Sequence, residues 1–75
     1  MLNGLVINYY ESGIVSSKTN FKDQLRHGQD ILYHENGRVR QDANYTEDQL
    51  HGESRVYFEN GNLATVENFK DGEKD

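Results

Sequence analysis

The sequence predicts an all-β protein: an array of three stacked antiparallel β-hairpins, about six strands, forming one twisted, open meander sheet. Two observations predict this fold. A 24-residue pattern recurs three times, over residues 4–27, 28–51 and 52–75. Within each copy, apolar and polar residues alternate with a period near two, which is typical of strands and not of helices. The 75 residues are therefore expected to form a single repeat domain, 1–75.

Glycines and aromatic residues mark the three copies. Six of the seven glycines occupy two columns, one opening each copy and one at its turn: Gly4, Gly28 and Gly52, and Gly13, Gly37 and Gly61. All eight aromatic residues occupy three columns, broken only by a histidine: Tyr9, Tyr33 and Tyr57; Tyr10, His34 and Phe58; Phe21, Tyr45 and Phe69. The two glycine columns and the column of Phe21 are expected to be structural.

Strands are expected near residues 5–11, 14–22, 29–35, 38–46, 53–59 and 62–70. Two-residue type I′ turns are favoured by the dipeptides Asn36-Gly37 and Asn60-Gly61 and, more weakly, by Ser12-Gly13. The segments 23–27 and 47–51 are interpreted as short polar connectors between hairpins. No helix is expected.

A two-residue turn fixes the pairing within each hairpin. In the second copy it places Gly28 opposite Tyr45, so that the aromatic ring covers bare backbone and supplies packing that glycine lacks. The same register places residues 32, 34 and 35 opposite 41, 39 and 38. One face then collects the glycine column with the columns of Phe21, Val15 and Tyr10, and the other carries the Tyr9 column with Ile7, Ile31 and Arg55. A three-residue loop with a bulge would change these faces.

Composition narrows the classes of function. There is no cysteine, which excludes disulfides and thiolate metal sites. The net charge of −5 argues against nucleic acid as a partner and disfavours an anionic membrane, because both attract basic surfaces. The first residues contain neither a basic region nor a long apolar run, so no signal peptide or transmembrane segment is expected. The cytoplasm is the favoured compartment, unless the chain is a fragment of a longer array.

Several motifs resemble MORN repeats. They are Tyr-Phe-Glu-Asn-Gly-Asn-Leu at residues 57–63, Asn-Phe-Lys-Asp-Gly at 68–72 and the connector Leu-His-Gly at 50–52. The resemblance is closest to the bacterial variant found in antitoxin-like or immunity-like proteins, and it covers residues 4–74. Gln24 and Asp48 depart from it, since they stand where that pattern has a connector glycine. The resemblance implies stacked hairpins that serve as an interaction surface, sometimes for membranes or lipids.

No catalytic, metal-binding or cofactor-binding residues are expected, and the protein is not expected to be an enzyme. His27 and His51 are equivalent positions on one edge, and two imidazoles without a carboxylate in fixed geometry make a poor zinc site. The glutamates before the turns, Glu11, Glu35 and Glu59, are interpreted as solvated charges and not as a pair for acid and base catalysis.

The column of Tyr9, Tyr33 and Tyr57, flanked by Arg40 and Arg55, is the predicted binding surface for a partner protein. The family resemblance suggests a basic toxin or effector as that partner. In the alternative interpretation the rings only cover the thin sheet or pack against a neighbouring chain. Attachment to a lipid surface is the second functional hypothesis, and the open sheet edges suggest a homodimer.

Overall fold

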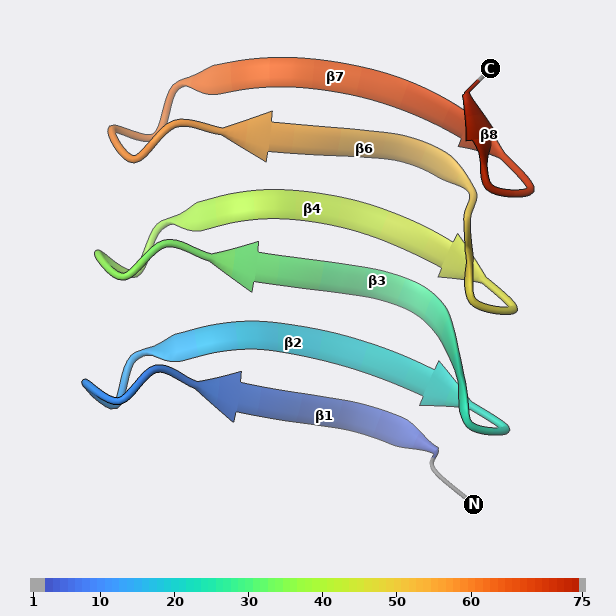
Figure 1. The fold of residues 1–75 in the computed structure, drawn as a ribbon, viewed down its shortest axis with the longest axis horizontal. Coiled ribbons are helices and arrows are strands. Elements are labelled where there is room, and N and C mark those ends of the chain that lie inside the picture. The colour runs from blue at the N-terminus through green and yellow to red at the C-terminus, as the bar shows by residue number, and fades with distance from the viewer. Residues whose placement is uncertain (1–2, 75) are drawn as a thin grey trace.

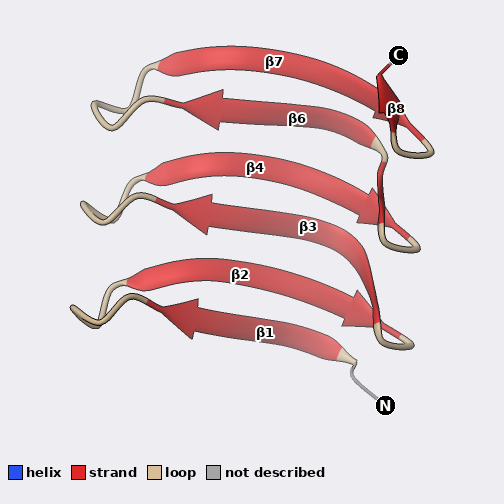
Figure 2. Ribbon diagram, in the orientation of Figure 1, coloured by secondary structure: helices blue, strands red, loops and turns tan. Residues whose placement is uncertain are grey.

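The structure is a computed structural model that describes residues 3–74 as one antiparallel sheet, with no helix in that range (Figures 1 and 2). Its long strands lie side by side in chain order: β1 (Gly4–Tyr9), β2 (Val15–Lys22), β3 (Leu25–Tyr33), β4 (Val39–Thr46), β6 (Gly52–Tyr57) and β7 (Leu63–Lys70). The short strands β5 (Gln49–Leu50) and β8 (Glu73–Lys74) pair with the ends of β4 and β7. The predicted fold class is confirmed; Met1, Leu2 and Asp75, which the expected domain includes, lie outside the described residues.

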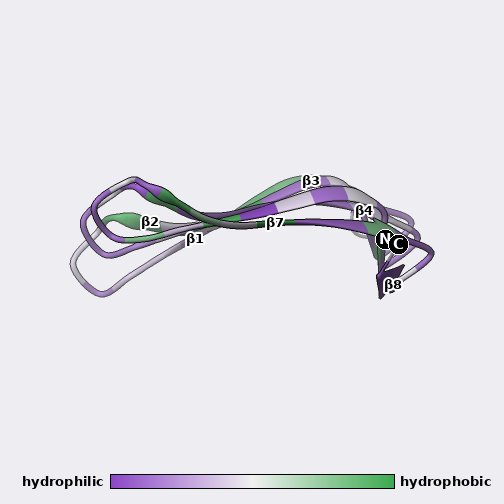
Figure 3. Cartoon of the chain, turned by 90° about the horizontal axis from the view of Figure 1, so that it is seen from above, coloured by the Kyte–Doolittle hydropathy of each residue, from purple (hydrophilic) through white to green (hydrophobic). Residues whose placement is uncertain are grey.

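The sheet is a single layer. Its extents are 31 × 30 × 11 Å, and Figure 3 shows it nearly edge-on as one gently curved ribbon. Among residues 3–74 only Ala43 and Ser54 are buried, with exposed fractions of 2% and 6%. The pairing of Asp42 with Arg55 brings Ala43 and Ser54 opposite one another at the centre of the sheet. A core of two small residues leaves both broad faces in contact with solvent.

The Asn-Gly turns differ from the prediction. The amide of His34 donates to the Arg38 carbonyl at 2.8 Å, and the amide of Gly37 donates to the His34 carbonyl at 3.0 Å. Gly37 has a φ of +89°, whereas Asn36 is not in the left-handed region. The expected type I′ turn is therefore wrong: the loop has three residues, 35–37, and ends in a left-handed glycine followed by a bulge. The other two copies repeat this geometry, with backbone bonds from Tyr10 to Ile14 and from Phe58 to Asn62.

The bulge changes which side chains share a face. Gly28 pairs with Tyr45 and Leu32 with Gln41, as predicted. Beyond them the register shifts, so that Val39 pairs with Tyr33 and not with His34. Paired residues project from the same face. The column of Val15, Val39 and Leu63 therefore joins the tyrosines, and its expected place on the glycine face is wrong.

The connectors are the real two-residue turns. Both central residues have positive φ in each of them, as a type I′ turn requires: Asp23 (52°) and Gln24 (71°), Glu47 (49°) and Asp48 (71°), Asp71 (52°) and Gly72 (85°). Each turn joins a paired residue on either side: Lys22 with Leu25, Thr46 with Gln49, Lys70 with Glu73. The segments expected to be polar links therefore contain strand residues as well as turns, and β3 begins at Leu25 instead of near residue 29.

Gly28 is required by the backbone. Its φ is +98°, at the point where the register between β2 and β3 shifts and β3 bends. A Cβ at Gly28 would lie 3.7 Å from the Cβ of Asn20 and would meet no atom of Tyr45 within 4 Å. The predicted pairing of Gly28 with Tyr45 is confirmed, but the reason for glycine is its left-handed conformation and not room for a ring.

Candidate functional site

One apolar row crosses the whole sheet near its Asn-Gly turns. The register places Tyr9 beside Val15, Tyr33 beside Val39 and Tyr57 beside Leu63. These six side chains, one from each long strand, are called the tyrosine row, and the face that carries them is called the tyrosine face. The sequence pattern identified the three tyrosines. It missed the three aliphatic members, because their place depends on the bulge.

The tyrosine row is most exposed at its two ends. Tyr9, on β1, is 62% exposed and Leu63, on β7, is 49% exposed, whereas Tyr33 and Tyr57 are half-buried by neighbouring strands. The Lys18 ammonium lies 5.7 Å from the centre of the Tyr33 ring, in the range of a cation–π contact. The row therefore offers aromatic and aliphatic surface with the Lys18 ammonium beside it.

The two predicted arginines lie in different places. Arg55 belongs to the tyrosine face, where its Nε atom donates to the Glu53 carboxylate. That hydrogen bond raises the pKa of the Arg55 guanidinium, so Arg55 stays charged but is already paired. Arg40 instead lines a hollow with Tyr10 and His34, away from the row.

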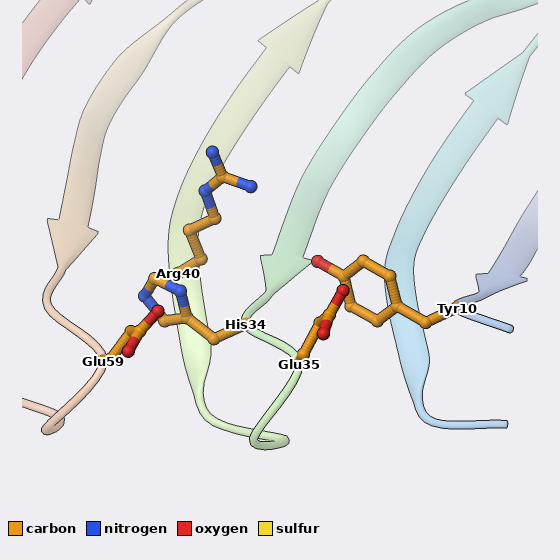
Figure 4. A pocket seen from close by; sticks show the side chains of 5 residues that line it. All are labelled: Tyr10, His34, Glu35, Arg40 and Glu59. Carbon is orange, nitrogen blue, oxygen red and sulfur yellow. The ribbon is translucent and has the colours of Figure 1, made fainter. Parts of the chain in front are cut away.

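The hollow that contains Arg40 lies beside the Asn-Gly turns (Figure 4). Its volume is about 400 Å³, and it is lined by Tyr10, His34, Glu35, Arg40 and Glu59. In Figure 4 the two carboxylates and the imidazole gather near the turns, whereas the Arg40 side chain extends along its strand. The lining is polar and carries charges of both signs, which suits solvent or polar groups of a partner.

Two side chains of this hollow bridge neighbouring copies. The Tyr10 hydroxyl donates to the backbone carbonyl of Tyr33, and the Nε2 atom of His34 lies 2.9 Å from the backbone carbonyl oxygen of Tyr57. Because a carbonyl oxygen only accepts, the His34 Nε2 atom must carry the proton. Tyr10 and His34 hold one copy against the next, which gives their column a structural role that the sequence alone did not assign.

A second bridge lies at the connector end of the sheet. The Arg26 Nε atom donates to the Asp48 carboxylate at 2.6 Å, and its guanidinium lies 4.2 Å from the centre of the Tyr45 ring. The hydrogen bond from Arg26 lowers the pKa of the Asp48 carboxyl, and the same contact raises the pKa of Arg26. Arg26 thus links the turn of one copy to the strand of the copy before it.

Within residues 3–74 no group of three or more histidine and carboxylate side chains could hold a metal ion. His51, one of the two equivalent connector histidines, lies beside Asp71, with 3.9 Å between its Nδ1 atom and a carboxylate oxygen. In that same range, no helix is both long and apolar enough to cross a membrane.

Comparison with known protein families gives one match. The model of a MORN repeat variant matches residues 2–23 and again residues 50–71. Each segment has 22 residues, so together they cover more than half of the chain. The two segments are 48 residues apart, which is two lengths of the 24-residue copy. Neither the curated proteins nor the solved structures contain a match to this chain.

Proposed function

Because the chain belongs to the MORN repeat variant family, we propose that it is a non-catalytic interaction module that binds a partner protein through its tyrosine face. Repeats of this family generally serve as protein or membrane interaction modules and generally carry no catalytic site. The observation that carries the proposal is the tyrosine row: six apolar side chains level with one another across six strands, with no layer of residues 3–74 above them.

The chemistry of the row suits a protein partner. Tyrosine supplies rigid contact area with a polar tip and is enriched at protein interfaces. From β1 to β7 the row crosses five strand spacings, or about 24 Å. A contact of this length fits the footprint of a standard protein interface. The half-buried rings of Tyr33 and Tyr57 would lose little side-chain freedom on binding, since the sheet already restricts them.

Charge favours a basic partner. The chain carries a net charge of −5, and its third copy holds six of the 13 acidic residues. A complementary positive surface would accelerate encounter and align the two proteins. An antitoxin-like or immunity-like role against a basic toxin or effector is a narrower form of this proposal, and its only support is the sequence resemblance carried by residues 57–63, 68–72 and 50–52.

The test compares variants of the two candidate surfaces. Partners would be captured from the native host with the unmodified chain, with a Tyr33→Ala plus Tyr57→Ala variant, and with Arg40→Ala as the control for the hollow. We expect one specific partner to be lost with the tyrosine variant and retained with Arg40→Ala. A partner retained by the tyrosine variant would contradict the proposal, provided that circular dichroism shows the variant to be folded. Tyr9→Ala, at a position already 62% exposed, perturbs the sheet least and serves as the second test.

Membrane attachment is the competing outcome. Sedimentation with vesicles that contain anionic lipid separates the two functions. The acidic surface predicts no binding, whereas salt-sensitive binding that Tyr33→Ala plus Tyr57→Ala abolishes would assign the tyrosine face to lipid instead of protein.

A further inference from the structure

The two outer edges of the sheet carry most of the exposed large apolar side chains. Of the eight in residues 3–74, five lie on β1 or β7: Leu5 (54%), Ile7 (38%), Tyr9 (62%), Leu63 (49%) and Val66 (44%). In the part of the chain that the structure describes, no strand pairs with the outer side of β1, and only the two residues of β8 pair with the outer side of β7. Both edges therefore combine unmet backbone hydrogen bonds with exposed apolar surface.

The repeats themselves specify what would fit the β7 edge. Copies one and two meet where Lys18 pairs with Ile31. Copies two and three meet where Asp42 pairs with Arg55. Lys18 and Asp42 occupy the position in their repeats that Val66 occupies in the third repeat. Ile31 and Arg55 occupy the position that Ile7 occupies in the first repeat. Continuing either junction by whole 24-residue repeats would therefore place a residue equivalent to Ile7 opposite Val66. The two internal junctions therefore agree that the β7 edge matches the β1 edge of a second copy of this chain.

We propose that the chain associates with itself head to tail, with β1 of a second copy added antiparallel to β7 and Ile7 opposite Val66. This pairing puts two exposed apolar residues in direct contact, where the internal junctions have Lys18 with Ile31 and Asp42 with Arg55. It also brings the two ends of the tyrosine row together, because Leu63 ends the row on β7 and Tyr9 begins it on β1. The tyrosine row would then continue from one copy into the next.

Side chains beside the edge repeat the internal junction. The Asn36 Nδ2 group donates to the backbone carbonyl of Glu59, while its Oδ1 atom accepts from the Arg38 amide. Asn60 holds the same position one copy later, and its Oδ1 atom accepts from the Asn62 amide in the same way. Its Nδ2 group is thus oriented to donate to the backbone carbonyl of Glu11 in a second chain, because Glu11 is the residue equivalent to Glu59.

Charge distinguishes this arrangement from a symmetric dimer. Residues 4–27 carry three positive and two negative side chains, whereas residues 52–75 carry three positive and six negative ones. Head-to-tail contact places the positively charged first repeat of one chain against the negatively charged third repeat of another. Contact between two β7 edges would instead place two negatively charged third repeats together. Because the two edges differ, the contact does not close after two chains and extends into linear oligomers.

The short strand β8 leaves room on the β7 edge for β1 of a second chain. It pairs with Phe69 and Lys70 at the end of β7, as β5 pairs with Tyr45 and Thr46 at the end of β4. The next strand, β6, pairs further along β4, at Gln41 and Asp42. An added β1 would likewise lie beside residues 65 and 66, next to β8 and without displacing it.

Disulfide trapping tests the register directly, because the natural chain has no cysteine. Ile7→Cys and Val66→Cys would be purified separately, one of them labelled with ¹⁵N, then mixed and oxidised. Residues directly opposite across two strands have Cβ atoms about 4.5–5.5 Å apart, close to the separation that a disulfide needs. Gln29→Cys, exposed on the inner strand β3, is the control for random collision.

The expected product is the mixed disulfide between Ile7→Cys and Val66→Cys, formed severalfold faster than either homodisulfide or any disulfide of Gln29→Cys. Homodisulfides formed as fast as the mixed one would overturn the proposal. Sedimentation gives a second readout that needs no cysteine. The mass of the unmodified chain should rise with concentration and that of Val66→Lys should not, because an edge lysine opposes strand addition. A monomer at all concentrations would also overturn it, whatever the tyrosine face binds.

Discussion

The imidazole Nε2 atom of His34 lies 2.9 Å from the backbone carbonyl oxygen of Tyr57, a residue 23 positions later and in the next copy. Tyr10 makes the equivalent contact from the first copy to the carbonyl of Tyr33. Each bond joins two hairpins that are marginal alone, because a two-stranded hairpin in water is barely stable. The third copy has Phe58 at this position, which has no donor. These bonds therefore belong to the two internal junctions.

Tyr10→Phe and His34→Phe should each lower the free energy of unfolding by about 1 kcal/mol, the usual contribution of one hydrogen bond. Both changes keep an aromatic ring in place and remove the donor. Tyr10→Phe removes only the hydroxyl, whereas His34→Phe also replaces the imidazole with a larger apolar ring, which Phe58 shows that the fold accepts at this position. Urea denaturation followed by circular dichroism in dilute solution measures the loss.

The matched control is Tyr45→Phe, which also removes a hydroxyl from a half-buried ring. Phe21 and Phe69 stand at the equivalent positions, so this change should stay within about 0.5 kcal/mol of the unmodified chain. If all three variants lost the same stability, the bonds between copies would have no special weight and the structural role given to Tyr10 and His34 would be wrong.

A second prediction concerns the connector turns. Gln24 adopts a φ of +71°, a conformation that costs a residue with a side chain roughly 1–2 kcal/mol and glycine almost nothing. Gln24→Gly should therefore stabilise the chain, although the greater freedom of glycine in the unfolded state offsets about 0.5–1 kcal/mol of the gain. Thermal unfolding should show a melting temperature above that of the unmodified chain.

The reverse substitution is available in the third copy. Gly72→Ala should destabilise the chain by about 1 kcal/mol, because φ there is +85°. A Cβ at Gly72 would lie 3.7 Å from the Cβ of Gln49, an ordinary contact, so the cost would come from the backbone and not from a clash. Opposite signs for Gln24→Gly and Gly72→Ala are the expected pattern; equal signs would contradict the type I′ assignment.

The same turns show where sequence reasoning stops. The 24-residue period, the six long strands and the pairing of Gly28 with Tyr45 all follow from alternation and column spacing. The dipeptide Asn36-Gly37 fits either a type I′ turn or a three-residue loop, and the choice depends on the φ of Asn36, which no residue pattern specifies. One misassigned turn placed the column of Val39 on the wrong face, because the added loop residue shifts the pairing of Val39 by one, until the unpaired Arg40 restores the predicted register at Gln41.

The candidate site was predictable to a similar extent. Repetition marked Tyr9, Tyr33 and Tyr57 as a column, and alternation placed them on one face. The bonds of Tyr10 and His34 end on backbone carbonyls, which leave no trace in the sequence. Arg40 is the unpaired residue of the bulge, between Val39 and Gln41, so its assignment beside the tyrosines depended on the misassigned turn, and it lines the hollow instead.

A third prediction concerns pH. The Arg26 guanidinium lowers the pKa of the Asp48 carboxyl below its unfolded value of about 4. A group with a lowered folded pKa contributes stability above its unfolded pKa and loses that contribution as the pH falls through the folded pKa. The stability difference between the unmodified chain and Asp48→Asn should therefore be largest above about pH 4 and vanish at lower pH. Urea denaturation at a series of pH values measures this difference.

Two controls accompany Asp48→Asn. Asparagine tolerates the left-handed conformation, so the substitution keeps the turn, where φ is +71°. Glu47→Gln alters the neighbouring residue of the same turn, which has no salt bridge within residues 3–74, and should leave the pH profile unchanged. Since Asp48 and Arg26 are both partly exposed, 0.5 M salt should reduce the effect of Asp48→Asn. If the free energy of unfolding of Asp48→Asn depended on pH in the same way as that of the unmodified chain, the stabilising bond between Arg26 and Asp48 would be contradicted.

The last prediction tests where the sheet keeps its core. Ala43 is 2% exposed although only one layer of structure exists, so neighbouring side chains must cover it. Its opposite neighbour Ser54, at 6%, is covered in the same way. Ala43→Leu must push these side chains apart and should cost about 1–3 kcal/mol, as over-packing does. Asn44→Leu adds a leucine to the next residue of β4, which is exposed on the tyrosine face, and should stay within about 0.5 kcal/mol. If Ala43→Leu and Asn44→Leu lost the same stability, both faces of the sheet would have the same free space and the sheet would have no packed centre. Its strands would then be held in register by the backbone hydrogen bonds and by the side-chain bonds of Tyr10, His34 and Arg26.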